Sequence, residues 1–566
     1  MAAIHPPVPP IAAARAGCAG PTPWHPLALL GILALWLATA GNLPFWKMFL
    51  ALPEATGLPG LRLALTLGAA IFAVTLAALC LVVWPAWRRL AGIVLLVSAA
   101  VASHFMLAYG VVIDASMLHN AVATDPGEVR DLLSGSMVAA LLLGVLLPGA
   151  WWWRQRARPV GAMRLARAQL GLAALALVAG ALVAWSSFHD LAPLLRNHRA
   201  LRHAINPWNT VNATGQLAAR AFKGAGKPLE PVGTDARAAV AGDPDHAPLF
   251  VLVVGETARA ANFGLGGYGR DTTPELARLR EEGDLVYFDH VSACGTSTQV
   301  SVPCMFSGLP RDKADDAARR ENLLDVLHHA GLAVLWLDNQ SGCKGVCDRV
   351  DHAGTREAAD PALCAGGECL DEVMIRGLPE RLAALDPARR ARGTVLVLHQ
   401  MGSHGPAYHK RSPKESKRFL PECTSAALQD CDREQVVNTY DNSIAYTDRF
   451  LAATVQWLRA QDRPTALLYV SDHGESLGEK GLYLHGMPWA IAPEEQTHVP
   501  MLAWFSRGLQ RERGLSVACV RDRAGRAWSH ENLFDTMLGL AGVRTTAADP
   551  RRDILGGCGR QEDVAI

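Results

Sequence analysis

A run of small hydroxyl residues lies between two cysteines in the stretch SerAlaCysGlyThrSerThrGlnValSerValProCysMet, residues 292–305. A threonine or serine hydroxyl becomes a useful nucleophile when a metal ion or a base lowers its pKa. We interpret Thr298 as that nucleophile, because its β-branched side chain has few rotamers and the two cysteines can clamp the loop around it. Thr296 and Ser297 are its nearest rivals.

Candidate metal ligands directly follow two apolar runs that lie far from residues 292–305 in the sequence. Glu256 comes after LeuPheValLeuValValGly, while Asp472 and His473 come after AlaLeuLeuTyrValSer. Two carboxylates, one imidazole and the oxygen of Thr298 make four mixed ligands, which suit Zn²⁺, with Mn²⁺ as the alternative. A bound divalent ion would turn the threonine hydroxyl into an alkoxide-like nucleophile at neutral pH.

Four further side chains are candidates for contact with a phosphoryl group. His404 and His485 can bind a second metal, donate hydrogen bonds to phosphoryl oxygens or protonate a leaving group. His399 and Lys344 are candidates for phosphate contact. Each of these residues alone would more often be an ordinary loop residue. Their joint position after apolar runs favours a metal-assisted phosphoryl site.

The elements that must position these residues are short, β-rich apolar runs. They lie at 249–254, 332–337, 394–398 and 466–470, with helix-like segments between them. This alternation predicts an α/β fold with a largely parallel sheet. Each run ends in polar residues, and sites in such sheets lie at the carboxyl ends of the strands. We therefore expect the four strand ends to meet at one place.

The first 190 residues have a different composition, dominated by Ala, Leu, Val and Trp. About five apolar segments are long enough to cross a bilayer, and they lack the polar stripe of a soluble helix. They run at about 25–43, 63–84, 90–113, 136–153 and 169–187. The alternative for the first is a cleaved signal peptide, since AlaThrAla at 38–40 resembles a cleavage site.

Basic residues predict how these segments are oriented. Arg88 and Arg89 lie between segments two and three, and a larger group lies between segments four and five: Arg154, Arg156, Arg158, Arg164 and Arg167. The positive-inside rule places both loops and the N-terminus in the cytoplasm. Everything after the fifth segment is then outside.

The twelve cysteines support this orientation independently. Ten of them follow residue 290, mostly as close pairs: Cys294 and Cys304, Cys343 and Cys347, Cys364 and Cys369, Cys423 and Cys431. Even numbers at short spacing predict disulfides and an oxidising compartment, with a zinc-binding cysteine cluster as the weaker alternative. Pairing of Cys519 with Cys558 is a lesser expectation, and Cys18 and Cys80 should be free.

The chain of 566 residues is too long for one ordinary domain. We predict a transmembrane domain at 1–190, helices and a linker outside the membrane at 191–247, and a catalytic domain at 248–566. The basic stretch 196–202 suits an amphipathic helix on anionic headgroups, and the Gly- and Pro-rich stretch 223–236 suits a linker. The net charge of +1 suggests no nucleic-acid partner.

The loop between segments three and four also carries regularly spaced polar residues. Asn120, Thr124 and Glu128 are four residues apart and would share one helical face, although Pro126 argues against an unbroken helix. On spacing alone, an ordinary solvated loop is an equally good interpretation.

Five motifs in this order resemble those of the lipid A phosphoethanolamine transferases, a family that includes the mobile colistin-resistance enzymes. They are GlyGluThrAlaArgAlaAlaAsnPheGlyLeuGlyGlyTyrGlyArgAspThrThrPro (255–274), CysGlyThrSerThrGlnValSerValProCysMetPheSer (294–307), SerGlyCysLysGlyValCysAsp (341–348), HisGlnMetGlySerHisGlyProAlaTyr (399–408) and SerAspHisGlyGluSerLeuGly (471–478). The resemblance spans essentially the whole chain. It implies an N-terminal domain of five transmembrane helices, followed by a periplasmic α/β domain with an alkaline-phosphatase/sulfatase-like fold.

The resemblance also implies roles for single residues. Thr298 matches the nucleophile that carries phosphoethanolamine, and Glu256, Asp472 and His473 match zinc ligands. The other matches are the auxiliary histidines His404 and His485, the substrate-pocket residues Lys344 and His399, and the donor-binding residues Asn120, Thr124 and Glu128. Ala261 and Gln299 depart from the residues common in the family.

The function that the resemblance implies is transfer of phosphoethanolamine from phosphatidylethanolamine to lipid A through a phospho-threonine intermediate. We expect one zinc ion with a second possible, a monomer in the bacterial inner membrane, and polymyxin resistance through a less negative outer membrane. The alternatives are transfer to another acceptor, such as the lipopolysaccharide core, and a phosphoglycerol transferase. A sulfatase is disfavoured, because the sequence has no CysXaaProXaaArg or SerXaaProXaaArg motif.

Overall fold

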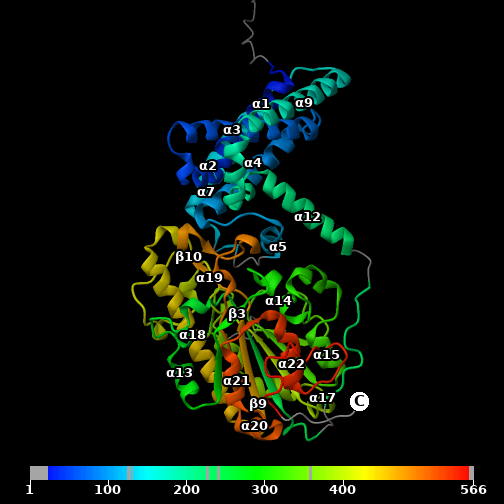
Figure 1. Ribbon diagram of the computed structural model, residues 1–566, viewed down its shortest axis with the longest axis vertical. Helices are drawn as coiled ribbons and strands as arrows, with labels where there is room; N and C mark the ends of the chain where they lie inside the picture. Colours follow the sequence, from blue (N-terminus) through cyan, green and yellow to red (C-terminus); the bar gives the residue numbers. More distant parts are fainter. Residues whose placement is uncertain are drawn as a thin grey trace, which may run out of the picture.

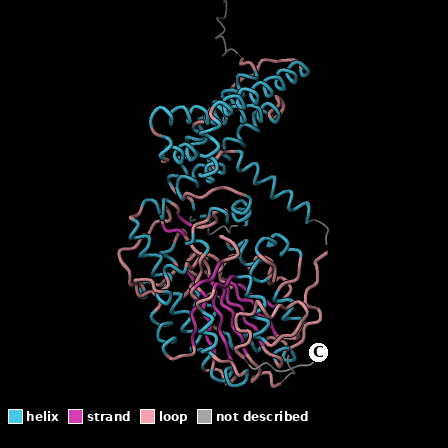
Figure 2. The backbone as a smooth tube through the Cα atoms, viewed as in Figure 1, coloured by secondary structure: helices cyan, strands magenta, loops and turns pink. Residues whose placement is uncertain are grey.

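The computed structural model describes residues 23–123, 129–130, 132–224, 228–238, 242–355 and 360–559. Figure 1 shows an all-helical part stacked end to end on an α/β part. All the strands gather in the α/β part (Figure 2).

Five helices in the described residues are long and apolar enough to cross a membrane, as the sequence predicts. The spans are Pro26–Leu50, Gly57–Val82, Arg88–Tyr109, Gly135–Arg154 and Ala162–Ser186. The first comprises α1 (Pro26–Ala38) and α2 (Leu43–Leu50), separated by a 3₁₀ turn. The next two are α3 (Gly57–Val82) and α4 (Arg88–Tyr109). The fourth runs from α7 (Gly135–Leu141) to α8 (Leu147–Arg154), and the fifth is α9 (Ala162–Ser186).

Three short helices follow the fifth span: α10 (Phe188–Asn197), α11 (Arg199–His203) and α12 (Trp208–Gly224). In Figure 1, α12 leaves the helical part and descends along the side toward the α/β part. The linker expected at 223–236 packs in part against the α/β part, because Val232 and Ala236 are buried in its core. The backbone of Glu230 pairs with that of Arg320 in an isolated bridge.

The α/β part is built on a seven-stranded sheet with the order β2-β12-β9-β1-β8-β4-β5. Its centre is formed by four mutually parallel strands: β9 (Thr465–Ser471), β1 (Leu249–Gly255), β8 (Thr394–His399) and β4 (Ala333–Asp338). These are the four strands expected from the sequence, and they are immediate neighbours. The edges carry β5 (Asp351–Gly354), parallel to β4, and the antiparallel pair β12 (Met501–Phe505) and β2 (Leu285–Phe288).

Helices cover both faces of the sheet, which explains why the strands are continuously apolar. Alternate residues of β1 point into opposite cores: Phe250 and Leu252 into one, Leu249 and Val251 into the other. The first core is covered by α14 (Thr298–Phe306), α15 (Leu323–His329), α20 (Arg507–Arg513), α21 (Val517–Ala524) and α22 (Leu533–Ala541). The second is covered by α13 (Pro274–Glu281), α16 (Leu378–Ala383) and α18 (Arg433–Arg459).

The smaller elements complete the α/β part and its contact with the helices. They are α5 (Ala115–Ala123), α17 (Pro387–Arg390), α19 (Glu494–Thr497), β3 (His290–Ser292), β6 (Cys364–Ala365), β7 (Glu368–Cys369), β10 (Ser476–Leu477), β11 (Tyr483–Leu484) and β13 (Ala527–Ser529). Helix α5 contacts both α12 and α14, so it lies where the two parts of the molecule meet.

Disulfides join all four of the close cysteine pairs, and a fifth links Cys519 to Cys558. All five lie in the α/β part. Cys80 is a free, buried cysteine, as expected, and Cys18 lies outside the described residues.

Candidate functional site

The centre of the candidate site lies just beyond two neighbouring strand ends. Gly255 at the end of β1 is paired in register with Ser471 at the end of β9. Glu256 directly follows the first, while Asp472 and His473 directly follow the second, so the fold brings the three side chains together. All three residues are fully buried.

Thr298 reaches this group from the opposite side, as the first residue of α14. Its Oγ1 donates to Glu256 Oε2 at 3.0 Å and lies 3.4 Å from His473 Nε2. The hydroxyl of its rival Thr296 instead donates to the Met487 carbonyl at 2.7 Å. The N-terminal end of a helix also favours negative charge, so a phosphoryl group at Thr298 would lie in a favourable field.

The spacing of these atoms fits a tetrahedral metal ion. His473 Nε2 lies 3.4 Å from both Asp472 Oδ2 and Glu256 Oε1. Oxygen and nitrogen ligands about 2.0–2.1 Å from a tetrahedral zinc ion lie about 3.3–3.4 Å from one another. Asp472 Oδ2 is buried without a hydrogen-bond partner, so it is available as a ligand. Cys343 and Cys347, which lie near Asp348, offer no comparable site because they form a disulfide.

The outer atoms of the same residues are already occupied, which orients the ligand atoms. His473 Nδ1 donates to the Gly474 carbonyl at 2.9 Å, which leaves Nε2 to face the carboxylates. Asp472 Oδ1 accepts the backbone N–H groups of Thr257 and His473, at 3.1 and 2.7 Å.

The electrostatics indicate a buried site that is short of positive charge. Burial and the charge of Glu256 raise the pKa of Asp472 to about 7. Burial alone would lower the pKa of His473, but the charge of Asp472 and the hydrogen bond to Glu256 outweigh it and raise that pKa to about 10. Burial likewise opposes ionisation of Glu256, yet His473 holds its pKa below the usual value. A divalent cation would supply the positive charge that the protonated imidazole otherwise provides.

The two auxiliary histidines extend the site to one side. The ring of His485 lies 4.3 Å from that of His473 and 5.9 Å from that of His404, centroid to centroid. Burial lowers the pKa of His485 to about 3, so its imidazole is neutral at physiological pH. Its Nδ1 lies 3.4 Å from the carboxyl group of Glu475.

Glu475 is a site residue to which the sequence analysis gave no role. It is fully buried, and burial raises its pKa well above the usual value. The hairpin formed by β10 and β11 explains the contact, since Ser476 pairs with Leu484 and the next residue outward on each strand is Glu475 or His485.

His399 ends β8, and Asp338 ends the neighbouring β4. His399 Nδ1 bonds to Asp338 Oδ2 at 2.9 Å, whereas its buried Nε2 has no hydrogen-bond partner. Burial lowers the pKa of His399, but the charge of Asp338 outweighs that effect and raises it overall. Lys344 lies in the loop after β4 at φ +53°, and its Nζ donates to Ser341 Oγ at 2.7 Å.

Asp371, which the sequence analysis also missed, fixes the loop between His399 and His404. Its buried carboxylate accepts the backbone N–H groups of Met401 and Gly402, at 2.7 and 3.0 Å. Gly402 has φ +51°, and a Cβ there would lie 2.6 Å from the Glu256 carbonyl oxygen, so glycine is required. No spacing in the sequence pointed to Asp371.

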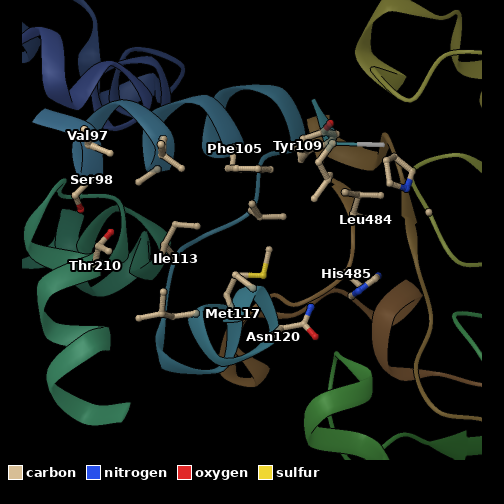
Figure 3. A pocket seen from close by; sticks show the side chains of 18 of the residues that line it. Val97, Ser98, Phe105, Tyr109, Ile113, Met117, Asn120, Thr210, Leu484 and His485 are labelled. Carbon is tan, nitrogen blue, oxygen red and sulfur yellow. The ribbon is translucent and has the colours of Figure 1, made fainter. Parts of the chain in front are cut away.

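A cavity of about 530 Å³ lies between the helical part and the α/β part, with His485 in its lining. Its walls are mainly apolar residues of α4 and α5, with Leu484 and His485 at the side of the α/β part. Figure 3 shows Asn120 and His485 near each other at one end, whereas Val97 and Thr210 lie toward the other. Thr124 and Glu128 lie outside the described residues.

Comparisons with known proteins cover both parts of the chain. Residues 71–222 match the model of the phosphoethanolamine transferases EptA/EptB, and residues 248–543 match the sulfatase model. The chain is 39% identical to phosphoethanolamine transferase EptA of Salmonella typhimurium, across 94% of this chain and 97% of that protein. It is also 39% identical to phosphatidylethanolamine transferase Mcr-1 of Escherichia coli, across 85% and 90%.

One solved structure aligns with nearly the full length of both parts. It is the integral membrane lipooligosaccharide phosphoethanolamine transferase A of Neisseria meningitidis, with a TM-score of 0.89 and 33% identity. The alignment covers 94% of this chain and 99% of that one.

Proposed function

Because the chain belongs to the phosphoethanolamine transferase family, we propose that it transfers phosphoethanolamine from phosphatidylethanolamine to lipid A. The observation that carries the proposal is the buried contact of the Thr298 hydroxyl with Glu256 and His473 at the start of α14. The names of two similar proteins support the substrates, one a phosphatidylethanolamine transferase and the other a lipooligosaccharide phosphoethanolamine transferase.

We assign one zinc ion to Glu256, Asp472, His473 and the oxygen of Thr298. His473 Nε2 lies 3.4 Å from an oxygen of each of the other three, a spacing that suits tetrahedral coordination. When bound, zinc would lower the pKa of the hydroxyl and stabilise charge on oxygen. The hydrogen bonds that the Thr257 and His473 N–H groups donate to Asp472, and that His473 Nδ1 donates to the Gly474 carbonyl, support the assignment, because they hold the ligand atoms in place before metal arrives. A second metal beside His404 and His485 stays a prediction.

In the first half of the reaction, Thr298 Oγ1 attacks the phosphorus of the donor. A Thr298 oxygen–phosphorus bond forms, and the bond from phosphorus to the diacylglycerol oxygen breaks. Glu256 Oε2, 3.0 Å from the hydroxyl, accepts its hydrogen bond and orients Oγ1 for attack, and the proton that Thr298 gives up passes to solvent. His404 returns a proton to the diacylglycerol oxygen, while neutral His485 donates one N–H to a phosphoryl oxygen.

In the second half, a phosphate oxygen of lipid A attacks the same phosphorus, and the bond to Thr298 breaks. The attacking phosphate hydroxyl gives its proton to His404, which lost one in the first half, and Thr298 takes up a proton from solvent, so both residues return to their starting states. The covalent intermediate lets the diacylglycerol leave before the second lipid docks, so one small site serves both substrates in turn. Lys344 and His399 contribute positive charge toward the phosphoryl oxygens.

The cavity beside His485 is our candidate site for the donor. Its apolar wall on α4 and α5 suits diacylglycerol chains, and Asn120 and His485 lie together at the end where a headgroup would reach the site. Glu128 would pair with the ammonium group, with Asn120 and Thr124 nearby. The last assignment rests on sequence alone, since two of its three residues lie outside the described residues.

We further propose that the enzyme is a monomer in the bacterial inner membrane, with residues 248–566 forming a periplasmic catalytic domain. The basic loops and the oxidised cysteines support this orientation. Each transfer adds a positively charged amine to lipid A. The outer membrane then attracts cationic polymyxins less strongly, which gives resistance.

Mass spectrometry of lipopolysaccharide from cells with and without the gene tests the function. We expect phosphoethanolamine on lipid A in cells with the gene, and none when it encodes Thr298→Ala. Ser297→Ala is the matched control and should still transfer. Addition to the core alone would show another acceptor, and addition of phosphoglycerol would show another donor.

The intermediate needs a separate experiment with purified enzyme and phosphatidylethanolamine but no acceptor. The peptide that contains Thr298 should gain the mass of phosphoethanolamine. Modification of Ser297 instead, or transfer by Thr298→Ala, would disprove the assigned nucleophile.

A further inference from the structure

A second cavity, of about 780 Å³, lies at the other end of the helical part from the α/β part. It is formed by the loop between α3 and α4 and the loop between α8 and α9. In Figure 1 this is the end where α1 begins. An isolated bridge between Trp24 and Ala157 ties the start of α1 to the second loop. The cavity is therefore separate from the catalytic site.

Four arginines line this cavity: Arg88, Arg89, Arg156 and Arg158. No aspartate or glutamate is among its lining residues, and none of the four arginines forms an ion pair with another part of the described chain. The cavity thus concentrates positive charge that the protein itself leaves uncompensated. Its natural ligand is an anion.

Arg88 is the feature that distinguishes this cavity from a merely basic surface. It is only 7% exposed, its Nη2 donates to the Gln155 carbonyl at 2.9 Å, and its guanidinium carbon lies 5.0 Å from the Trp152 ring centroid. Its Nη1 is buried and has no hydrogen-bond partner. A buried charged donor without an acceptor is costly, and the guanidinium fork matches the oxygens of a phosphate.

The surroundings identify the kind of phosphate. Trp87 and Trp153 also line the cavity and are half exposed, as tryptophans at a membrane interface are. Leu90 and Val160 add apolar surface beside the arginines. Basic pockets between transmembrane helices at this level suit the headgroups of anionic phospholipids.

We propose that this cavity binds the phosphodiester headgroup of an anionic phospholipid from the leaflet opposite the catalytic domain. Phosphatidylglycerol is the simplest such lipid. Arg88 contacts a phosphate oxygen with Nη1, while Arg89, Arg156 and Arg158 neutralise the remaining charge. The proposal does not depend on the reaction, and in the topology given above the leaflet is the cytoplasmic one.

The competing explanation is that the arginines only set the orientation in the membrane. Arg164 and Arg167 distinguish a binding site from a purely topological role. They are exposed residues of α9 near the same loop, but they do not line the cavity. A purely topological role would make all these arginines equivalent. A binding site requires those of the cavity and not the other two.

The test is native mass spectrometry of the delipidated full-length protein in detergent, titrated with phosphatidylglycerol, phosphatidylcholine or inorganic phosphate. We expect tight binding of one phosphatidylglycerol. Losing one charge-assisted hydrogen bond in Arg88→Gln should weaken binding roughly tenfold or more. Arg156→Gln, at an exposed position that the fold does not need, should weaken it too. The matched control Arg164→Gln should bind as the wild type does.

Three results would each overturn the proposal. Phosphatidylcholine could bind as tightly as phosphatidylglycerol, or Arg164→Gln could weaken binding as much as Arg156→Gln. Inorganic phosphate could displace the lipid at equal concentration, which would make the site one for free phosphate.

Discussion

His530 connects the loop before Thr298 to the end of β9, and the connection requires a neutral imidazole. Its Nδ1 accepts the backbone N–H of Cys294 at 3.0 Å, and its Nε2–H donates to the carbonyl of Ser471 at 2.9 Å. Protonation would place a second hydrogen on Nδ1 against the N–H of Cys294. Burial accordingly lowers the pKa of His530 to about 3.

The size of the effect on stability follows from linkage. An unfolded histidine titrates at about 6.5, so between that pH and 3 the unfolded chain binds a proton that the folded chain excludes. Stability is therefore fully present above pH 6.5 and is lost as the pH falls. Each pH unit costs about 1.4 kcal/mol, so this one group removes about 2 kcal/mol of unfolding free energy at pH 5.

His530→Gln isolates this contribution, because an amide keeps one acceptor and one donor but does not titrate. The assay is thermal unfolding of the full-length protein in detergent, at pH 7 and pH 5. The wild type should lose about 2 kcal/mol more than the variant between these pH values. His290→Gln, at an exposed position on β3, is the control and should match the wild type. Equal losses in the wild type and His530→Gln would refute the reasoning.

Further predictions concern the metal, the loop and the topology. Asp472→Asn should lose bound zinc and transferase activity together, measured by metal analysis and lipid A mass spectrometry; unchanged zinc would remove Asp472 from the ligand set. Gly402→Ala should cost about 1–3 kcal/mol, since alanine is strained at φ +51° and crowds Glu256, and wild-type unfolding would contradict this. A periplasmic reporter fused after residue 190 should be active and one near Arg158 inactive; the reverse pattern would show that the chain has the opposite orientation in the membrane. Peptide mapping should find Cys343 and Cys347 resistant to alkylation without reductant, whereas alkylated thiols would contradict the disulfide.

The central strands could be predicted because burial on both faces leaves a signal in the sequence. β1, β4, β8 and β9 are almost continuously buried, so they form apolar runs, and the polar residue after each run marks the end of the strand. The edge strand β5 has no such signal, since Asp351–Gly354 is largely exposed. Its pairing depends on β4 and not on its own residues.

The ends of the membrane helices were harder to predict than their number. The second span begins at Gly57, although the apolar segment was expected from residue 63, because Leu58 and Pro59 belong to the first turn of α3. The first span continues to Leu50, seven residues beyond its expected end, since a second helix, α2, begins directly after the 3₁₀ turn. Hydropathy identifies the part of a helix that is in the membrane, and the helix continues beyond it.

Glu475 shows why a site residue can stand inside a recognised motif and still escape notice. In SerAspHisGlyGluSer, Asp472 and His473 directly follow a predicted strand, so the sequence indicates where they lie. The position of Glu475 beside His485 depends instead on a short hairpin. The turn between β10 and β11 needs Gly478 and Gly481 at positive φ, and that turn carries His485 back to Glu475. The parallel strands thus position Glu256, Asp472 and His473, while the hairpin places the buried carboxyl group of Glu475 beside the neutral imidazole of His485. These two groups of side chains therefore depend on two separate elements of the fold.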